Sequence, residues 1–352
     1  MPTLSNAPTW TLPAALYRSP AQFELERERI FAPNWSLFTW SRRVAEPGDY
    51  VTGISAGFPI FVVRDEDGRL RGFHNVCRHR GATLLAAERG TCGKVLTCPY
   101  HAWAYARDGR LLKATDFGSP LDAAQFGLLE IDVGEWRGFV FVRTKRQGGD
   151  LRAWLGPIDA MAADYDLESQ RFFAAKEREV AVDWKAYGEN YLECYHCRMM
   201  HPGLCEAMDI GRYVIDVHRK DWSFHLHAPR RDGGFSRGLY FYRFPFLMLN
   251  LYDWGSSIAT LEPLGPGRVR HVNWYFFTDV SPEREEANTQ AMEWSARIVS
   301  EDLDMLLGVQ RNLEAGAYDR GPLSPRWEHA VAAFQDMVRT AIDPEPALMA
   351  AA

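Results

Sequence analysis

Two short segments, each combining one cysteine with one histidine, constrain the fold of this chain more than any other feature. The first is Cys77-Arg78-His79 and the second is Cys98-Pro99-Tyr100-His101, with eighteen residues between them. Thiolate and imidazole groups are common ligands of transition metals. Because each segment offers one of each, we predict a metal centre held between two facing loops.

Two kinds of metal centre fit these ligands. In a Rieske [2Fe-2S] centre, two cysteines bind one iron and two histidines bind the other, so each of two loops can supply one ligand of each kind. A structural zinc site is the alternative, but zinc ligands usually come as a CxxC pair followed by an HxxxH pair. The mixed order in this chain favours the two-iron centre.

A second group of ligand types lies in the segment ENYLECYHCRMMHP, residues 189–202. His196 and His201 are five positions apart, so on a regular helix they would point about 140° away from each other. Pro202 disfavours helical geometry at the residue before it. We therefore predict irregular backbone between the two histidines, which would let them bind one ion. The alternative is that each is an ordinary core or surface histidine.

A non-heme Fe(II) oxygenase site needs two histidines and one carboxylate, with other positions open for O2. Glu193 would share a helix face with His196, but we expect it to support the site rather than to bind the metal. Asp302 lies on an apolar stripe at helical spacing, which predicts a carboxylate that points inward and needs a metal or a partner. We predict Asp302 as the third ligand, with a buried ion pair as the alternative. The stripe consists of Val299, Leu306, Val309 and Leu313.

Glu301 and Asp304 fall elsewhere on the same predicted helix. They neighbour Arg297, Ser300 and Arg311 in the sequence. A surface of this composition is typical of a solvated helix face. We therefore expect neither carboxylate to take part in the site.

The hydrophobic pattern predicts an α+β chain in three parts. Residues 1–39 form an N-terminal arm, and residues 40–147 form an all-β domain of short strands and turns that holds the two Cys-His loops. The segment Gln147-Gly148-Gly149-Asp150 marks the next boundary. Residues 148–352 form a catalytic domain with an antiparallel sheet and a long helix from about residue 283 to 315.

The charge, the apolar runs and the cysteine content of the chain limit the partners and the location that we expect for it. The formal net charge is −6 and the basic residues are scattered, so we expect no nucleic acid and no membrane as a partner. The N-terminal segment has no secretory pattern and no apolar run is long enough to span a bilayer, which predicts a cytoplasmic protein. Six cysteines suggest no disulfide framework. Cys194 and Cys197 form a CxxC pair that could be redox-active or metal-binding, but we expect them to be reduced packing residues.

The motifs CxHRG, CPYHxW and ENxxExYHxxxxHP, followed by a late ED ahead of VQ, occur in the order found in the oxygenase α-subunits of Rieske non-heme iron oxygenases. The chain resembles this family over nearly its whole length. The resemblance implies a Rieske domain and a helix-grip (START/Bet v1-like) catalytic domain. It also implies two cofactors, a [2Fe-2S] cluster and Fe(II). The ligands would be Cys77, His79, Cys98 and His101 for the cluster, and His196, His201 and Asp302 for the mononuclear iron.

The resemblance further implies how the enzyme receives electrons. The chain has no GxGxxG motif after a strand and no set of cysteines for a second cluster, so a separate NAD(P)H-dependent reductase, with or without a ferredoxin, would deliver them. Members of the family usually form homotrimers. In such a ring His101 would contact Glu193 across subunits, and Glu193 would contact His196 as an electron-transfer bridge.

The substrate is less closely defined by the sequence. Many members of the family have aspartate at the bridging position, where this chain has Glu193. In this respect the chain resembles the members that oxidise quaternary ammonium compounds by hydroxylation or N-demethylation with O2. Hydroxylation of an aromatic ring is one alternative, and a non-catalytic Rieske electron carrier is another. Aromatic faces attract cations, and the candidate rings are Phe241, Tyr242, Phe244, Phe246, Tyr252, Trp254, Trp274 and Tyr275.

Overall fold

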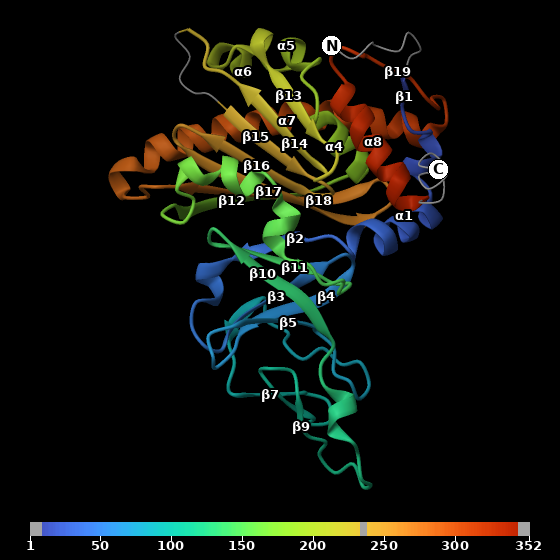
Figure 1. Cartoon of the computed structure of the whole chain (residues 1–352), viewed down its shortest axis with the longest axis vertical. Helices are drawn as coiled ribbons and strands as arrows, with labels where there is room; N and C mark the ends of the chain where they lie inside the picture. The colour runs from blue at the N-terminus through green and yellow to red at the C-terminus, as the bar shows by residue number, and fades with distance from the viewer. Residues whose placement is uncertain (1–8, 233–237, 344–352) are drawn as a thin grey trace. The chain divides into compact units, whose positions relative to one another are not determined.

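The computed structural model describes residues 9–232 and 238–343, and the chain forms two compact units. One unit consists of residues 31–154. The other combines the described residues up to Ile30 with those from Leu155 onward (Figure 1). The chain thus divides at 30/31 and 154/155, whereas the sequence-based limits lie at 39/40 and 147/148. The N-terminal segment therefore packs with the C-terminal part of the chain.

The unit of residues 31–154 is built from short antiparallel strands. These are β2 (Ser36–Trp40), β3 (Asp49–Ser55), β4 (Phe58–Arg64), β5 (Leu70–His74), β6 (Arg89–Thr91), β7 (Val95–Thr97), β8 (Ala104–Ala106), β9 (Leu111–Lys113), β10 (Glu130–Trp136) and β11 (Phe139–Arg143). Seven of them form a sheet of order β2-β11-β10-β5-β4-β3-β6, and the other three form a sheet of order β7-β8-β9.

The strands before the first Cys-His loop form a hairpin, as expected for a domain of short strands and turns. β4 pairs antiparallel with β5 in a register that places Ile60 opposite His74. The turn between them closes at Gly68, which has a φ of 75° in the left-handed region that glycine adopts easily. All four residues of the apolar run from Ile60 to Val63 are fully buried. Their burial anchors the sheet from which the first Cys-His loop leaves.

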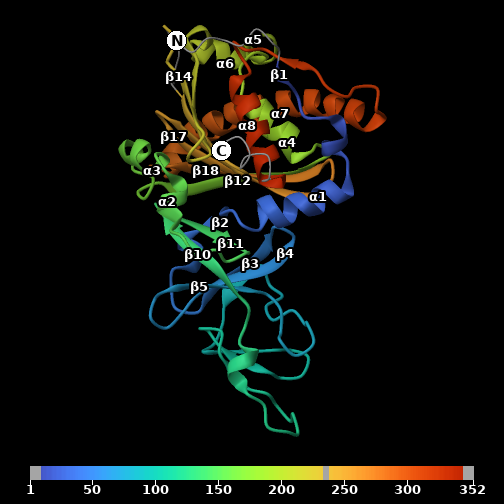
Figure 2. The same ribbon diagram turned by 45° about the vertical axis from the view of Figure 1, so that its right-hand side comes forward.

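The second unit contains one large antiparallel sheet with helices (Figures 1 and 2). Its strands are β12 (Arg171–Val180), β13 (Val214–His218), β14 (Ser223–Ala228), β15 (Gly238–Arg243), β16 (Leu247–Tyr252), β17 (Gly255–Gly265) and β18 (Arg268–Phe277), in the order β12-β18-β17-β16-β15-β14-β13. A separate short pair joins β1 (Thr9–Trp10) to β19 (Pro322–Leu323). The α-helices are α1 (Pro20–Glu26), α3 (Ile158–Met161), α4 (Trp184–Tyr191), α5 (Cys197–Met200), α6 (Pro202–Ala207), α7 (Glu285–Ala315) and α8 (His329–Ile342), and α2 (Leu151–Leu155) lies at the boundary between the units.

The long helix α7 confirms the helix predicted for residues 283–315. It starts with two acidic residues in its first turn, which the helix dipole favours, and it ends at Gly316 with a left-handed φ of 73°. Its buried side includes Leu303, Leu306 and Leu313. Val309 is 40% exposed, so its placement on the buried stripe was wrong. The predicted stripe repeats about every 3.5 residues, whereas a straight α-helix has 3.6 residues per turn. Over several turns, positions chosen at the shorter spacing therefore move away from the buried side.

Buried charges tie the N-terminal segment to α4. The ammonium group of Lys185 lies 2.8 Å from a carboxylate oxygen of Glu26 and 2.8 Å from one of Asp183, and all three side chains are almost fully buried. The hydroxyl of Tyr17 donates to Glu189 at 2.6 Å. Because a buried charge without a partner is costly, the residues before position 31 stabilise the helix that leads into the histidine segment.

No helix in the described ranges is long and apolar enough to cross a membrane.

Candidate metal centres

The two Cys-His loops have the same backbone geometry. In each, the amide of the cysteine donates to the carbonyl five residues later at 2.8 Å, and the amide four residues after the cysteine donates back to the cysteine carbonyl, at 3.0 Å after Cys77 and 3.1 Å after Cys98. The residues at that fourth position, Gly81 and Ala102, have left-handed φ values of 74° and 51°. The fold therefore presents two equivalent loops, each with one thiol and one imidazole.

The side chains of these loops converge. The rings of His79 and His101 have centroids 4.6 Å apart, and Trp103 stacks on His79 at 4.9 Å. The thiols of Cys77 and Cys98 are buried, and burial raises the pKa of Cys98. In the part of the chain that the structure describes, Nδ1 of His79 is a buried nitrogen without a hydrogen-bond partner. Two buried thiols and an unsatisfied imidazole nitrogen fit a bound iron-sulfur cluster.

The two loops together offer two buried thiols and two neighbouring imidazoles. This is the complete ligand set of a two-iron Rieske centre, in which the cysteines bind one iron and the histidines bind the other.

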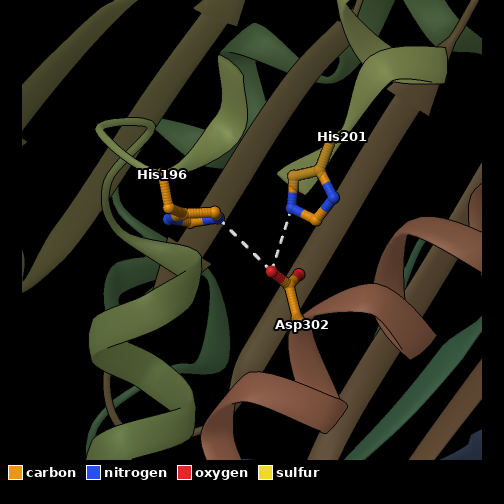
Figure 3. Close-up of side chains that lie close together, drawn as sticks. All are labelled: His196, His201 and Asp302. Carbon is orange, nitrogen blue, oxygen red and sulfur yellow. Dashed lines mark hydrogen bonds and ion pairs between the residues drawn. The ribbon is translucent and has the colours of Figure 1, made fainter. Parts of the chain in front are cut away.

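His196, His201 and Asp302 form the second centre (Figure 3). Nε2 of His201 lies 2.9 Å from Oδ1 of Asp302, and Nε2 of His196 lies 3.3 Å from the same oxygen. His196 precedes α5, His201 separates α5 from α6, and Asp302 lies on α7. Two imidazoles and one carboxylate facing a common point are the ligand set of non-heme Fe(II) oxygenases. The structure thus brings together the three residues predicted from the sequence.

The backbone around the histidines is broken as the sequence predicts, but at different points. α4 ends at Tyr191, and α5 is a single turn that ends at Met200. The next residue, His201, has a φ of −120° and a ψ of 70°, which are not helical. Pro202 begins α6, in agreement with the effect of proline on the preceding residue. The helix expected through Glu193 and His196 was wrong, because residues 192–196 are not helical.

A second carboxylate holds each histidine. Glu193 hydrogen-bonds to Nδ1 of His196 and accepts the backbone N–H of His196 at 3.3 Å. Glu301 lies 2.8 Å from Nδ1 of His201. Carboxylates in these positions fix the ring so that Nε2 faces the metal. The expectation that Glu301 lies on a solvated face was wrong. Neighbours on a helix point about 100° apart, so the ED pair alone does not indicate that both carboxylates face the site.

The electrostatics of the centre favour a cation. Burial disfavours a protonated His196, but the carboxylates of Asp302 and Glu193 outweigh that effect and raise its pKa to about 9. The pKa of His201 is raised in the same way, and the two histidines lower the pKa of Asp302 against the effect of its burial. A divalent ion would take the place of the protons that the carboxylates attract.

A cavity of about 120 Å³ adjoins the three ligands. Of the eight rings predicted as cation-binding candidates, only Tyr252 lines it, and three further tyrosines that line it were not among them. Trp254 stacks against Tyr252 at 4.3 Å without lining the cavity. The other candidate rings are core residues, so their assignment was wrong. The rings that line the cavity are Tyr191, Tyr213, Tyr240 and Tyr252.

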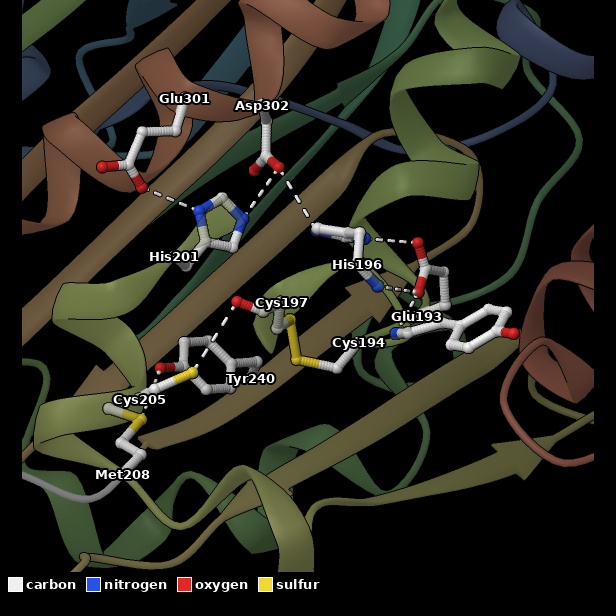
Figure 4. Close-up of a disulfide and its surroundings, with 11 residues drawn as sticks. Glu193, Cys194, His196, Cys197, His201, Cys205, Met208, Tyr240, Glu301 and Asp302 are labelled. Atoms are coloured by element: carbon white, nitrogen blue, oxygen red, sulfur yellow. Dashed lines mark hydrogen bonds and ion pairs between the residues drawn. A yellow bond between two sulfur atoms is a disulfide. The ribbon is translucent and has the colours of Figure 1, made fainter. Parts of the chain in front are cut away.

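Cys194 and Cys197 form a disulfide beside the centre (Figure 4). The expectation that both are reduced was therefore wrong. Because the two residues between them form a bend, their Cα atoms lie 4.9 Å apart, which is inside the range that disulfides require. Both cysteines line the cavity next to His196. The free cysteines are Cys77, Cys92, Cys98 and Cys205.

The fold and the two centres agree with a known class of enzyme. Residues 34–125 match the Rieske [2Fe-2S] domain family, and residues 167–344 match the catalytic domain of the ring hydroxylating alpha subunit. The chain belongs to the Rieske oxygenase α-subunit family. It is an oxidoreductase that carries a [2Fe-2S] cluster and a mononuclear iron, which confirms the predicted fold class, enzyme class and cofactors.

Individual relatives cover nearly the whole chain. The carnitine monooxygenase oxygenase subunit of Acinetobacter pittii is 31% identical over 94% of both chains. The chloroplastic choline monooxygenase of Arabidopsis thaliana is 30% identical over 88% of this chain and 78% of its own length. The solved quaternary ammonium Rieske monooxygenase CntA superposes with a TM-score of 0.86 and 27% identity over 96% of both chains. Naphthalene 1,2-dioxygenase, at 19% identity and a TM-score of 0.76, shares the fold.

Proposed function

We propose that this protein is the terminal oxygenase of a Rieske system that hydroxylates a small quaternary ammonium compound. The observation that carries the proposal is the cavity of tyrosine rings beside His196, His201 and Asp302, because aromatic faces attract cations. Relatives named carnitine monooxygenase and choline monooxygenase, at 31% and 30% identity, support it.

In this proposal, Cys77, His79, Cys98 and His101 hold the cluster, while His196, His201 and Asp302 hold the iron. The bound iron supplies the activation of O2 at the coordination positions that the three ligands leave open. Glu193 and Glu301 hold Nδ1 of the two histidines, so each ring keeps the orientation in which Nε2 faces the metal. The tyrosines bind and orient the substrate.

Electrons reach the iron from a separate reductase through the cluster. We propose that Glu193 links His196 of one subunit to the Rieske histidine, His101, in a neighbouring subunit of a homotrimer. The hydrogen bond between Glu193 and Nδ1 of His196 supports the intrasubunit half of this bridge. For CntA, a solved structure is described in terms of inter-subunit electron transfer.

Hydroxylation of an N-methyl carbon would give a hemiaminal, which collapses to an amine and formaldehyde. The test is a panel of methylated quaternary amines and aromatic compounds offered to the iron-loaded enzyme with a reductase. We expect product from the amines, with formaldehyde wherever an N-methyl group reacts. Products from the aromatic compounds alone would contradict the proposal and favour ring hydroxylation. The Asp302→Ala variant, which removes one iron ligand, is the control and should form neither product.

A further inference from the structure

We propose that the substrate is a quaternary ammonium compound whose other end carries no negative charge, such as an onium alcohol, rather than an onium carboxylate. This inference rests on the proposed function and specifies the substrate class of the same cavity. It separates the two kinds of compound, choline and carnitine, that appear in the names of the relatives.

The charges around the cavity argue against a substrate carboxylate. Within the described ranges, the carboxylates that line it are Glu193 and Asp302, and no lysine or arginine lines it. The two positive charges of a bound Fe(II) would be offset by these two carboxylates. A carboxylate that leaves water needs a cation or several hydrogen-bond donors as compensation. The described lining offers no cationic side chain for that purpose.

Three of the polar side chains that line the cavity make hydrogen bonds within the protein. The hydroxyl of Tyr191 donates to Oδ1 of Asn250 at 2.5 Å, and the amide of Asn250 donates to Ser257 at 2.9 Å. The hydroxyl of Tyr240 donates to the sulfur of Met208 at 3.2 Å. Because their hydroxyl protons are used within the protein, Tyr191 and Tyr240 present ring faces and oxygen lone pairs to a ligand, which suit a cation or a hydroxyl group better than an anion.

The rings form a corner for the cation. The rings of Tyr240 and Tyr252 are 5.7 Å apart and inclined at 82°, and Trp254 stacks behind Tyr252 at 4.3 Å. Two nearly perpendicular faces at this separation can both lie within about 6 Å of one ammonium group. Ser295 of α7 hydrogen-bonds with Tyr252, and Asp302 follows it two helical turns, or about 10 Å, along the same helix. A small onium compound in the corner would therefore lie in the same cavity as the iron ligands.

The test is a set of binding titrations on the iron-loaded enzyme, followed by tyrosine and tryptophan fluorescence or by calorimetry. The ligands are choline, glycine betaine, L-carnitine and 3,3-dimethylbutan-1-ol, the neutral carbon analogue of choline. We expect choline to bind about tenfold or more tighter than either carboxylate. The neutral analogue should also bind more weakly than choline, because it lacks the charge that the rings attract.

Two variants sharpen the test. Tyr252→Leu removes one wall of the corner and should weaken choline binding about tenfold while leaving the iron content unchanged. Ile298→Lys adds a cation to the lining of α7, and it should improve the affinity for L-carnitine relative to choline. Glycine betaine or L-carnitine binding as tightly as choline in the unmodified enzyme would overturn this inference and leave the proposed function standing. Choline binding no better than its neutral analogue would overturn both.

Discussion

The carboxylate of Glu301 lies 2.8 Å from Nδ1 of His201, although the two residues are 100 positions apart in the sequence. The next residue of α7, Asp302, lies 2.9 Å from the opposite nitrogen of the same ring. One turn of one helix thus determines both the position and the orientation of a histidine that another segment supplies. The pairing matches the carboxylate–histidine–metal arrangement that tunes metal sites.

Removal of this contact should weaken iron binding without disturbing the fold. We expect Glu301→Ala to lower the affinity of the mononuclear site for Fe(II) by about 10- to 100-fold, because the ring of His201 loses its fixed orientation. The measurement is iron content after challenge with a graded chelator, with the visible absorbance of the [2Fe-2S] cluster as the internal reference. Asp304→Ala, at an exposed position of α7, is the matched control and should retain iron. Equal losses in the two variants would rule out the positioning role.

The bridging role of Glu193 leads to a kinetic prediction. Glu193→Gln keeps the size and the acceptor oxygen of the side chain but removes its charge. We expect both metal centres to remain occupied, and oxidation of the reduced cluster in the presence of O2 and substrate to slow by about 10- to 100-fold. Stopped-flow absorbance of the cluster measures this rate. The control is Glu206→Gln, an exposed carboxylate on α6. A Glu193 variant with the normal rate would refute the bridge.

The buried carboxyl of Glu189 should make stability depend on pH. Burial raises its pKa from 4.5 to about 7, against the opposing hydrogen bonds from Tyr17 and Gln335. The folded protein therefore keeps a proton that the unfolded chain releases above about pH 4.5. For this group, the free energy of unfolding should fall by up to about 3 kcal/mol as the pH rises from about 4.5 to about 7.

Glu189→Gln isolates that contribution, because the amide does not titrate. Denaturant unfolding of the wild-type and variant proteins is compared at about pH 5.5 and about pH 7.5. We expect the loss of stability across this interval to be smaller in the variant. Contributions from other titrating groups cancel in the comparison. Identical pH dependence in the two proteins would be inconsistent with a raised pKa at Glu189.

The disulfide predicts a pattern of thiol reactivity. In protein denatured without a reductant, alkylation should modify Cys77, Cys92, Cys98 and Cys205 and leave Cys194 and Cys197 unmodified. After reduction, all six cysteines should react. Peptide mass spectrometry distinguishes these sites. Full alkylation of Cys194 and Cys197 before reduction would show that the pair is a dithiol in solution.

Much of the fold and of the metal sites could be read from the sequence, because their signals are local. The mixed order of Cys77, His79, Cys98 and His101 identified two ligand-bearing loops within short segments of sequence. The period of the hydrophobic residues identified the strands and the long helix. His196 and His201 could be paired because Pro202 predicts the backbone break between them. Asp302 was found because an inward carboxylate on a helix needs a partner.

Other features depend on how distant segments meet. Glu301 reaches His201 only because α7 crosses the histidine segment at one particular rotation, and helical period does not specify that rotation. Tyr252 lines the cavity while Phe241 is buried in the core, since the alternation of a strand defines two faces but not which face meets the metal. Residue types and spacings are properties of the chain, whereas the direction of each side chain depends on the packing of elements that are far apart in sequence.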